Sequence, residues 1–290
     1  MSEKDNKTDT SQRNSEILVE KASGEKEPFS EKKLIGSLKR AGADLDVIDH
    51  IVSDIKSWMH QGITTQKIYN RAFSLLRSSK YSTASRYKLK KAIMEMGPTG
   101  YPFEHLISRV MELQGYETQT GVVIDGRCVT HEVDVIATKE KKQIYVECKY
   151  GVSLGKIVSV QVPLYVHSRV NDIIAKRKKL NEYEGFSFGG CIATNTRFST
   201  DAIDFGTCSG LNMLAWDYPR GNGLKDIIDR EKIYPITVLN HLSKAQKQQL
   251  MDKGIVICRQ ISTDPKVLEP LSMNTRKRNA LLKEINNICF

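Results

Sequence analysis

The sequence lacks the features that mark membrane, secreted and zinc-binding proteins. No apolar run approaches the roughly 20 residues that a membrane-spanning helix needs, and the N-terminus has no hydrophobic signal-peptide core. The six cysteines are dispersed, without a C-x-x-C pair or a histidine at zinc-site spacing. We therefore expect a cytoplasmic protein that is not a membrane protein, with reduced thiols and without a zinc site.

Acidic residues are fewer than basic residues in this chain. The chain has 290 residues, with 44 Lys and Arg against 34 Asp and Glu, which gives a net charge of +10. A basic surplus of this size favours a polyanionic partner, either nucleic acid or an anionic membrane face, without choosing between them. The length leaves room for two or three small domains, each with its own core.

Charged residues gather around a hairpin expected between His131 and Lys149. β-branched and aromatic residues occupy 133–136 and 144–146, on either side of a lysine-rich turn, which predicts two paired strands. Because side chains alternate along a strand, pairing can bring four charged groups to one edge. They are Glu132, Asp134, Glu147 and Lys149.

This cluster has a chemical use. Two carboxylates at a sheet edge can hold Mg²⁺ through oxygen ligands, and a nearby lysine can position an attacking water. The reaction class that fits is metal-assisted phosphodiester hydrolysis. On spacing alone, an ordinary solvated hairpin with charged edges is the alternative interpretation.

The N-terminal part predicts a small hairpin followed by four helices, closed by Gly97-Pro98. Residues 1–15 are polar and aperiodic, and we expect them to be disordered. The order of elements resembles the ATP-cone, a nucleotide-binding regulatory module. The motifs that carry the resemblance are Val19-x-Lys21-x-x-Gly24, Glu27, Phe29, Lys33-Leu34 and Ala84-x-Arg86-Tyr87.

The ATP-cone resemblance implies a site for ATP or dATP. Lys21 and Lys33 would contact the nucleotide phosphates, and Val19, Glu27 and Leu34 would line the site. Ala22 stands where many cones have a second basic residue, which leaves the preference for a triphosphate open. The alternative is that both lysines are ordinary solvated side chains. A ribonucleotide reductase, the best-known host of this module, is excluded because its catalytic barrel needs several hundred further residues.

The segment after the linker at 97–100 predicts a helix, a three-strand meander, a helix, a strand, a helix and a last strand. Within it, 153–169 is expected to be mostly helical, broken or kinked by Pro163. The order resembles Mrr-type restriction endonucleases of the PD-(D/E)xK superfamily. The motifs that carry the resemblance are Phe103-Glu104, Gly115-Tyr116, Glu132-Val133-Asp134, Glu147-Cys148-Lys149 and Thr194-Asn195-x-Arg197-Phe198-x-x-x-Ala202.

The Mrr resemblance implies roles for five residues. Asp134 and Glu147 would be ligands of Mg²⁺ or Mn²⁺, and Lys149 would position the attacking water. Glu104 would be a supporting acid, and Gln161 would be a polar residue on the helix after the active site. Many members have glutamine in place of Glu147 and a glycine-rich entry before the aspartate. Whether Glu132 is a further metal ligand or only a neighbour of the site therefore stays open. On strand alternation His131 faces away from Asp134, which favours a structural role.

The fold class predicted is α/β. A restriction-endonuclease-like mixed sheet flanked by helices is preceded by a mainly helical ATP-cone and followed by a small helical segment. The boundaries expected are 16–97, 101–232 and 233–290. In the last part, helix, Gly254-Ile255 turn and helix faintly resemble a helix-hairpin-helix, whereas a packing or dimerisation domain is at least as well supported.

The function predicted is a metal-dependent DNA endonuclease of the restriction or defence type that ATP or dATP regulates through the cone. Double-stranded DNA would be held by phosphate contacts. The cationic residues expected there are Lys88, Lys90, Lys91, Lys156 and the run Lys176–Lys179. Two alternatives remain, a nucleotide-responsive DNA-binding regulator without cleavage and a repair or junction-resolving nuclease. A homo-oligomer stays open.

Overall fold

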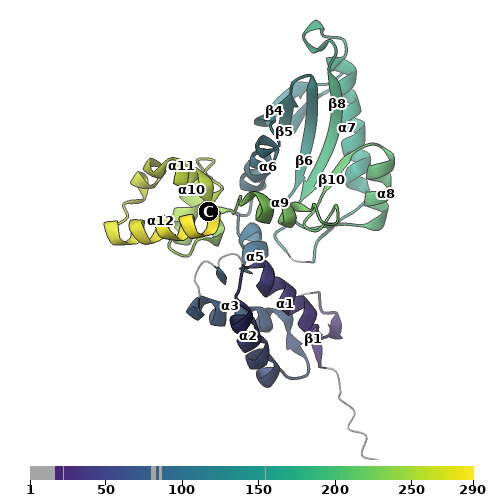
Figure 1. Cartoon of the computed structure of the whole chain (residues 1–290). Coiled ribbons are helices and arrows are strands. Elements are labelled where there is room, and N and C mark those ends of the chain that lie inside the picture. The colour runs from purple at the N-terminus through teal and green to yellow at the C-terminus, as the bar shows by residue number, and fades with distance from the viewer. Residues whose placement is uncertain (1–16, 22, 80–82, 85–86, 154) are drawn as a thin grey trace, which may run out of the picture.

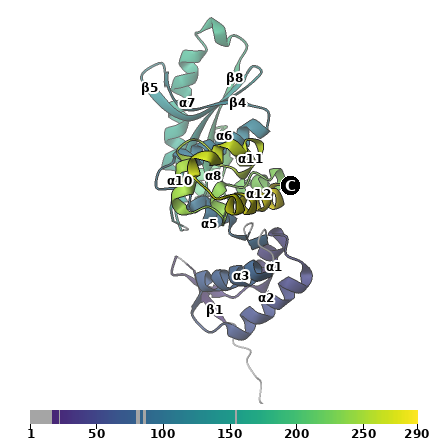
Figure 2. The ribbon, with the colours of Figure 1, turned by 90° about the vertical axis from the view of Figure 1, so that its left-hand side faces the viewer.

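The structure is a computed structural model, and it describes residues 17–21, 23–79, 83–84, 87–153 and 155–290. The tail expected to be disordered, Ala22 and Arg86 lie outside the described residues. In the first view, the N-terminal unit lies below the main sheet and the C-terminal helices lie beside it (Figure 1). A view turned by 90° shows the same separation of the N-terminal unit from the sheet (Figure 2).

The N-terminal unit combines a small sheet with helices packed on it. Ser30 caps the first helix because its side chain accepts a hydrogen bond from the Lys33 amide. The strand order is β2-β1-β3, and β3 runs parallel to β1. The elements are β1 (Leu18–Glu20), β2 (Lys26–Pro28), α1 (Glu31–Arg40), α2 (Leu45–Trp58), β3 (Ile63–Thr64), α3 (Thr65–Ser79) and α5 (Leu89–Met94).

The hairpin and the helices were predicted, but β3 was not. Its two residues carry no periodicity, and only the distant β1 gives them a partner. The apolar faces of α1, α2 and α3 bury a core of their own around Leu38, Ile51 and Leu76. The last of the four predicted helices is described from Leu89 as α5.

The second unit is built on a five-stranded mixed sheet in the order β10-β8-β6-β5-β4. The strands β4, β5 and β6 form the predicted antiparallel meander, and β8 and β10 continue the sheet in parallel with β6. Their bounds are β4 (Glu117–Asp125), β5 (Thr130–Lys139), β6 (Lys142–Lys149), β8 (Ser187–Thr194) and β10 (Asn212–Leu214). The predicted mixed α/β fold is confirmed.

Helices cover both faces of this sheet. One face packs on α6 (Tyr101–Leu113) and α9 (Leu224–Glu231), and the other on α7 (Gln161–Arg177) and α8 (Thr200–Cys208). The remaining elements of the unit are the paired strands β7 (Ile157–Val158) and β9 (Arg197–Phe198) and the 3₁₀ helix η1 (Asn181–Tyr183).

The prediction of a helix over 153–169 broken at Pro163 was wrong. The strand β7 comes first, and Pro163 is the third residue of α7. A proline near the start of a helix removes only an amide that has no partner within the helix, so it is tolerated there.

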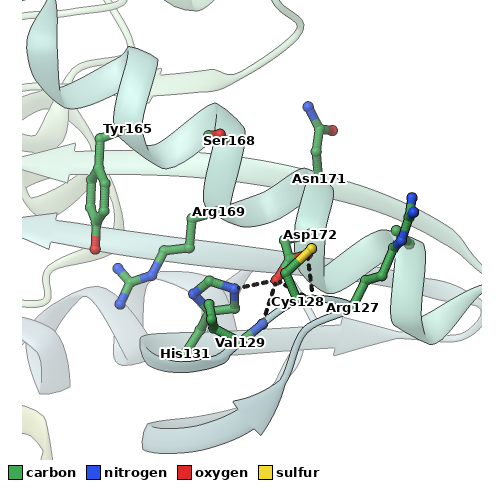
Figure 3. A pocket seen from close by; sticks show the side chains of 10 residues that line it. Arg127, Cys128, Val129, His131, Tyr165, Ser168, Arg169, Asn171 and Asp172 are labelled. Atoms are coloured by element: carbon green, nitrogen blue, oxygen red, sulfur yellow. Dashed lines mark hydrogen bonds and ion pairs between the residues drawn. The ribbon is translucent and has the colours of Figure 1, made fainter.

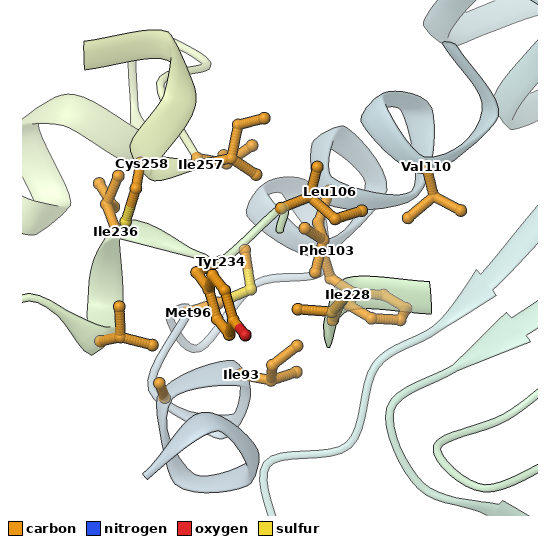
Figure 4. Close-up of a cluster of buried hydrophobic side chains, with 14 of the residues drawn as sticks. Ile93, Met96, Phe103, Leu106, Val110, Ile228, Tyr234, Ile236, Ile257 and Cys258 are labelled. Atoms are coloured by element: carbon orange, nitrogen blue, oxygen red, sulfur yellow. The ribbon is translucent and has the colours of Figure 1, made fainter. Parts of the chain in front are cut away.

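The C-terminal segment shares a core with the sheet and with α5. Ile93 and Met96 contact the same cluster as Phe103 and Leu106 of α6 and Tyr234 of the C-terminal segment (Figure 4). The segment comprises η2 (Ile236–Val238), α10 (Lys244–Met251), α11 (Cys258–Thr263), η3 (Pro265–Leu271) and α12 (Thr275–Cys289).

No helix in the described part of the chain is both long and apolar enough to cross a membrane.

Candidate active site and nucleotide site

The hairpin of β5 and β6 sets the candidate acids at one end of the sheet. Val135 pairs with Val146 at the last paired position of the two strands, and Asp134 and Glu147 are the next residues of β5 and β6 beyond it. The apolar residues of both strands are buried on the two faces of the sheet, against different helices, so a slip of one residue would exchange the side chains packed against α6 with those packed against α7.

Glu147 is held by two cations. Its Oε1 lies 2.5 Å from the Nζ of Lys149, and its Oε2 accepts a hydrogen bond from Arg169. Arg169 comes from α7, lies over the ring of Tyr165, and also donates to the backbone carbonyl of Glu132. The Glu147 side chain is only 9% exposed, so its charge is compensated inside the protein by these two partners.

Arg169 was missed by the sequence analysis. Its tie to Glu147 spans 22 residues and depends on how α7 lies over the sheet. A local signal existed in the spacing of Tyr165 and Arg169, which lie four residues apart on one helix face. That signal indicates a neighbouring pair on the helix and not a partner on another element.

Asp134 lies against the same strand. Its Oδ2 accepts a hydrogen bond of 2.6 Å from the amide of Cys148. Burial, followed by the charge of Glu147, raises the pKa of Asp134 to about 6, although the Cys148 amide acts in the opposite direction. Its interaction with Glu147 shows that the two carboxylates are close enough to repel each other.

Glu104 reaches the cluster from the opposite side of the sheet. It lies in the first turn of α6. Burial, followed by the charges of Asp134, Glu132 and Glu147, raises its pKa to about 7. The structure therefore brings Glu104, Asp134, Glu147 and Lys149 into one electrostatic cluster, to which Glu132 contributes from its exposed position.

The donor chemistry of this cluster fits a hard divalent cation. Carboxylate oxygens are the ligands that Mg²⁺ and Mn²⁺ prefer, and a cation between Asp134 and Glu147 would relieve their repulsion. With Glu147 turned to Lys149 and Arg169, no three acidic, histidine or cysteine groups of the described residues are arranged as a ready-made metal site. A cation held by both Asp134 and Glu147 would require the Glu147 carboxylate to turn away from Lys149 and Arg169.

Two other residues of this region differ in their surroundings. Gln161 is exposed as the first residue of α7, and within the described residues its side chain makes no hydrogen bond to the four-residue cluster. His131 pairs through Nε2 with Asp172 at 2.8 Å (Figure 3). The amides of Cys128 and Val129 also donate to Asp172, and these bonds, led by that from His131, lower the pKa of Asp172 to about 2.

His131 and Asp172 therefore tie the β4–β5 connection to α7. They line a surface pocket of about 500 Å³ that Arg169 also borders. Because Arg169 contacts Glu147, this pocket lies next to the acid cluster. The position of His131 agrees with a structural role.

The cone residues form a chain of ion pairs. Glu27 lies between Lys21, at 2.8 Å, and Lys33, at 3.2 Å. Lys21 also pairs with Glu25 at 3.1 Å. Hydrogen bonds from Lys21 and Lys33 lower the pKa of Glu27. The two lysines thus converge on one carboxylate, as two phosphate ligands of one site would.

The two apolar residues of the predicted nucleotide site are core residues. Val19 is 3% exposed and Leu34 is 7% exposed, and both belong to the core of the N-terminal unit. They support the strand and the helix from which Lys21 and Lys33 project.

Some of the lysines that we expected to contact DNA instead lie against other parts of the protein. Lys88 is turned toward the C-terminal segment, where its Nζ lies 3.4 Å from Oδ1 of Asn240, and burial lowers its pKa. Lys90 lies near the ring of Trp216. Lys178 and Lys179 are exposed just beyond α7, whereas Arg177 stacks on Tyr183.

The turn that resembled a helix-hairpin-helix has its amides already engaged. The N–H groups of Gly254 and Ile255 donate to carbonyls of α10, and those of Val256 and Ile257 donate to the side chain of Gln260. Gly254 is buried. This geometry favours the packing alternative over a turn that binds DNA phosphates.

Three family models match successive parts of the chain. The ATP cone domain matches residues 17–94, the restriction endonuclease model Mrr_cat matches residues 96–220, and the AF1548-like C-terminal model matches residues 234–289. The first two matches confirm the resemblances found in the sequence, and the third was not predicted.

The chain is also similar to individual proteins. An uncharacterized protein of Archaeoglobus fulgidus is 28% identical over 183 residues, which cover 63% of this chain and 99% of that protein. The crystal structure of AF1548, a protein of unknown function, is 27% identical with a TM-score of 0.54 and covers 66% of this chain and 98% of its own.

The restriction endonuclease MspJI, solved with a 27-mer oligonucleotide, is 13% identical with a TM-score of 0.31. The match covers 69% of this chain and 41% of MspJI, and a likeness at this level carries no argument.

Proposed function

We propose that this chain, which joins an ATP-cone, an Mrr-type restriction endonuclease domain and an AF1548-like C-terminal domain, is a Mg²⁺-dependent DNA endonuclease that ATP or dATP regulates. The observation that carries the proposal is the electrostatic cluster of Glu104, Asp134, Glu147 and Lys149 at one end of the sheet. It occurs inside the segment that matches a restriction endonuclease.

Asp134 and Glu147 would hold the cation, and Glu104 would support it from α6 or through a water. When bound, Mg²⁺ or Mn²⁺ supplies positive charge next to the scissile phosphate and lowers the pKa of a bound water. Asp134 is kept in place by the Cys148 amide. Arg169 limits the movement of Glu147 and compensates its charge.

Lys149 would orient the attacking water. Burial acts to lower its pKa, but the hydrogen bond and the charge of Glu147, together with the charge of Asp134, outweigh burial and raise it, which favours the ammonium form. An ammonium can hold a water and stabilise the charge that develops on the phosphate oxygens. When Glu147 turns to a cation, the Nζ of Lys149 becomes available for this role.

The net charge of +10 supports a polyanionic partner, and we take double-stranded DNA as the substrate. Exposed cations near α7, Lys178 and Lys179, are candidates for phosphate contacts. Such contacts position the duplex without reading its sequence.

Cleavage of supercoiled plasmid in Mg²⁺ tests the active site. Asp134→Ala and Lys149→Ala should each abolish cleavage and leave retention of DNA in a gel-shift assay largely intact. Lys142→Ala, at the other end of the same strand, is the matched control and should cleave like the unaltered protein. Unchanged cleavage in either of the first two variants would refute the assignment.

The same assay separates the alternatives. An unaltered protein that retains DNA but cleaves none with Mg²⁺ or Mn²⁺, with or without ATP and dATP, would favour a DNA-binding regulator. Cleavage confined to branched DNA would favour a repair or junction-resolving enzyme.

The nucleotide role has its own test. Binding of ATP to the folded state should raise the melting temperature of the full chain. Lys21→Ala combined with Lys33→Ala should remove that increase, because both ammonium groups that converge on Glu27 are lost. Lys39→Ala with Lys67→Ala removes two exposed charges of the same unit and serves as the control. An increase that persists without Lys21 and Lys33 would reject the nucleotide site.

A further inference from the structure

A basic pocket lies where the cone meets the restriction endonuclease domain. It has a volume of about 340 Å³ and is lined by residues of the β1–β2 connection, the start of α3, α5, the segment before β7, and β9. Its charged lining residues are Lys21, Glu25, Lys90, Lys156 and Arg197. Two of its four cations come from within residues 17–94 of the ATP-cone match and two from within the 96–220 match.

The positive charges of this pocket outnumber its carboxylates. Four cationic side chains face one lining carboxylate, Glu25, which already pairs with Lys21 at 3.1 Å. Burial lowers the pKa of Lys90, and the charge of Arg197 lowers it further. An arrangement of this kind costs energy unless an anion offsets it.

The cone supplies the reason to expect a nucleotide there. Lys21 is the lysine that the ATP-cone resemblance assigns to the phosphates, and it is a lining residue of the pocket. Its two carboxylate partners, Glu25 and Glu27, are exposed or half-buried, so a phosphate can displace them. A phosphate bound to Lys21 on this side lies next to cations of the second domain.

We propose that the nucleotide site of the cone is completed by the restriction endonuclease domain, with Lys156 and Arg197, together with Lys90, binding the outer phosphates of a nucleoside triphosphate. This proposal rests on nucleotide binding by Lys21 and assigns Lys90 and Lys156 to the nucleotide in place of DNA. The β- and γ-phosphates carry most of the ligand's charge, so the shared site distinguishes a triphosphate from a monophosphate.

The second half of the pocket is tied to the strand that carries Lys149. Ile157 pairs with Arg197 across β7 and β9. Asn195 holds Gly151 through two hydrogen bonds, from the Gly151 amide at 2.7 Å and to the Gly151 carbonyl at 2.8 Å.

One further bond reaches the active-site strand itself, because the Thr194 hydroxyl donates to the Lys149 carbonyl at 2.6 Å. A triphosphate that fixes Lys156 and Arg197 would therefore also restrain Lys149 and Gly151, through Thr194 and Asn195. This is a physical route from nucleotide to active site.

Calorimetric titration of the full chain with ATP, ADP and AMP tests the proposal. Lys156→Ala with Arg197→Ala should weaken ATP binding about 10- to 100-fold, since each lost contact is a charge-assisted hydrogen bond. AMP binding should change less than about twofold, because its single phosphate is held by the cone. Lys156→Glu alone should weaken ATP binding more than Lys156→Ala.

The control is Lys253→Ala with Lys266→Ala, which removes two exposed charges of the C-terminal segment and should leave ATP binding unchanged. Hydrogen exchange gives a second readout, in which ATP, but not AMP, should slow exchange at residues 156–158 and 195–198.

The outcomes separate the two proposals. If Lys21→Ala weakens ATP binding and the Lys156 and Arg197 pair does not, the composite site is refuted and the cone site stands. If the unaltered protein binds no ATP, both proposals fail. If the pair loses DNA affinity while ATP binding is unchanged, the pocket takes a DNA phosphate and the composite site is refuted.

Discussion

Removal of Arg169 should lower the stability of the fold, because Arg169 compensates the buried charge of Glu147. The arginine side chain is 14% exposed and that of its partner Glu147 is 9% exposed. Loss of one partner of a buried ion pair costs about 3–5 kcal/mol. Lys149 stays at 2.5 Å from Glu147 and compensates part of the charge, so we expect Arg169→Met to cost about 2–3 kcal/mol.

A double-mutant cycle isolates the interaction from the loss of packing. Glu147→Gln removes the buried charge, so the double variant should be more stable than the sum of the single changes predicts, by about 1–3 kcal/mol. Mg²⁺ should stabilise the Arg169→Met variant more than the unaltered chain, because the cation takes over the lost compensation.

Urea unfolding followed by tryptophan fluorescence measures these effects. The chain has two tryptophans, and a Trp58→Phe background leaves Trp216 to report on the restriction endonuclease domain. Arg230→Met is the control, since its pair with Glu231 is exposed and should contribute less than about 1 kcal/mol. Additive changes within about 0.5 kcal/mol would refute a coupled, buried pair.

Two further predictions concern pH and salt. Because Glu104 has a pKa raised from 4.5 to about 7, its contribution to stability is present below pH 4.5 and is lost as the pH rises through 7. Glu104→Gln should flatten this loss in urea unfolding across the same window, and an unchanged pH profile would count against the assignment. For DNA, replacement of Lys176, Lys178 and Lys179 by Gln should lower the slope of log affinity against log salt by up to about 2.7, at about 0.9 for each phosphate contact. Equal slopes in filter binding would remove these lysines from the interface.

Local patterns predicted the elements whose stability is largely local. The strands β5 and β6 follow from β-branched and aromatic residues on both sides of a turn. The helix α6 follows from apolar residues at helical spacing after a proline at its second position. The convergence of Asp134, Glu147 and Lys149 then depends only on register, which the two buried faces of the sheet specify.

The features that the sequence did not predict depend on contacts between residues far apart in the chain. The strands β3, β7 and β9 have two residues each and exist through pairing with segments far away in the chain. Arg169 is one of many helical arginines until α7 is laid over the sheet. The basic pocket requires the relative placement of two domains, each of which shows only scattered lysines in the sequence.

The shared core of α5, α6 and the C-terminal segment also has a consequence for biosynthesis. The Thr237 hydroxyl donates to the carbonyl of Ala92 across 145 residues, and Leu281 and Ile285 lie in the same core as Phe103. A ribosome-bound chain that has completed only the sheet leaves that apolar face of α6 uncovered. A chain truncated before α12 leaves this shared core incomplete, and we expect it to be a substrate for chaperones and proteases.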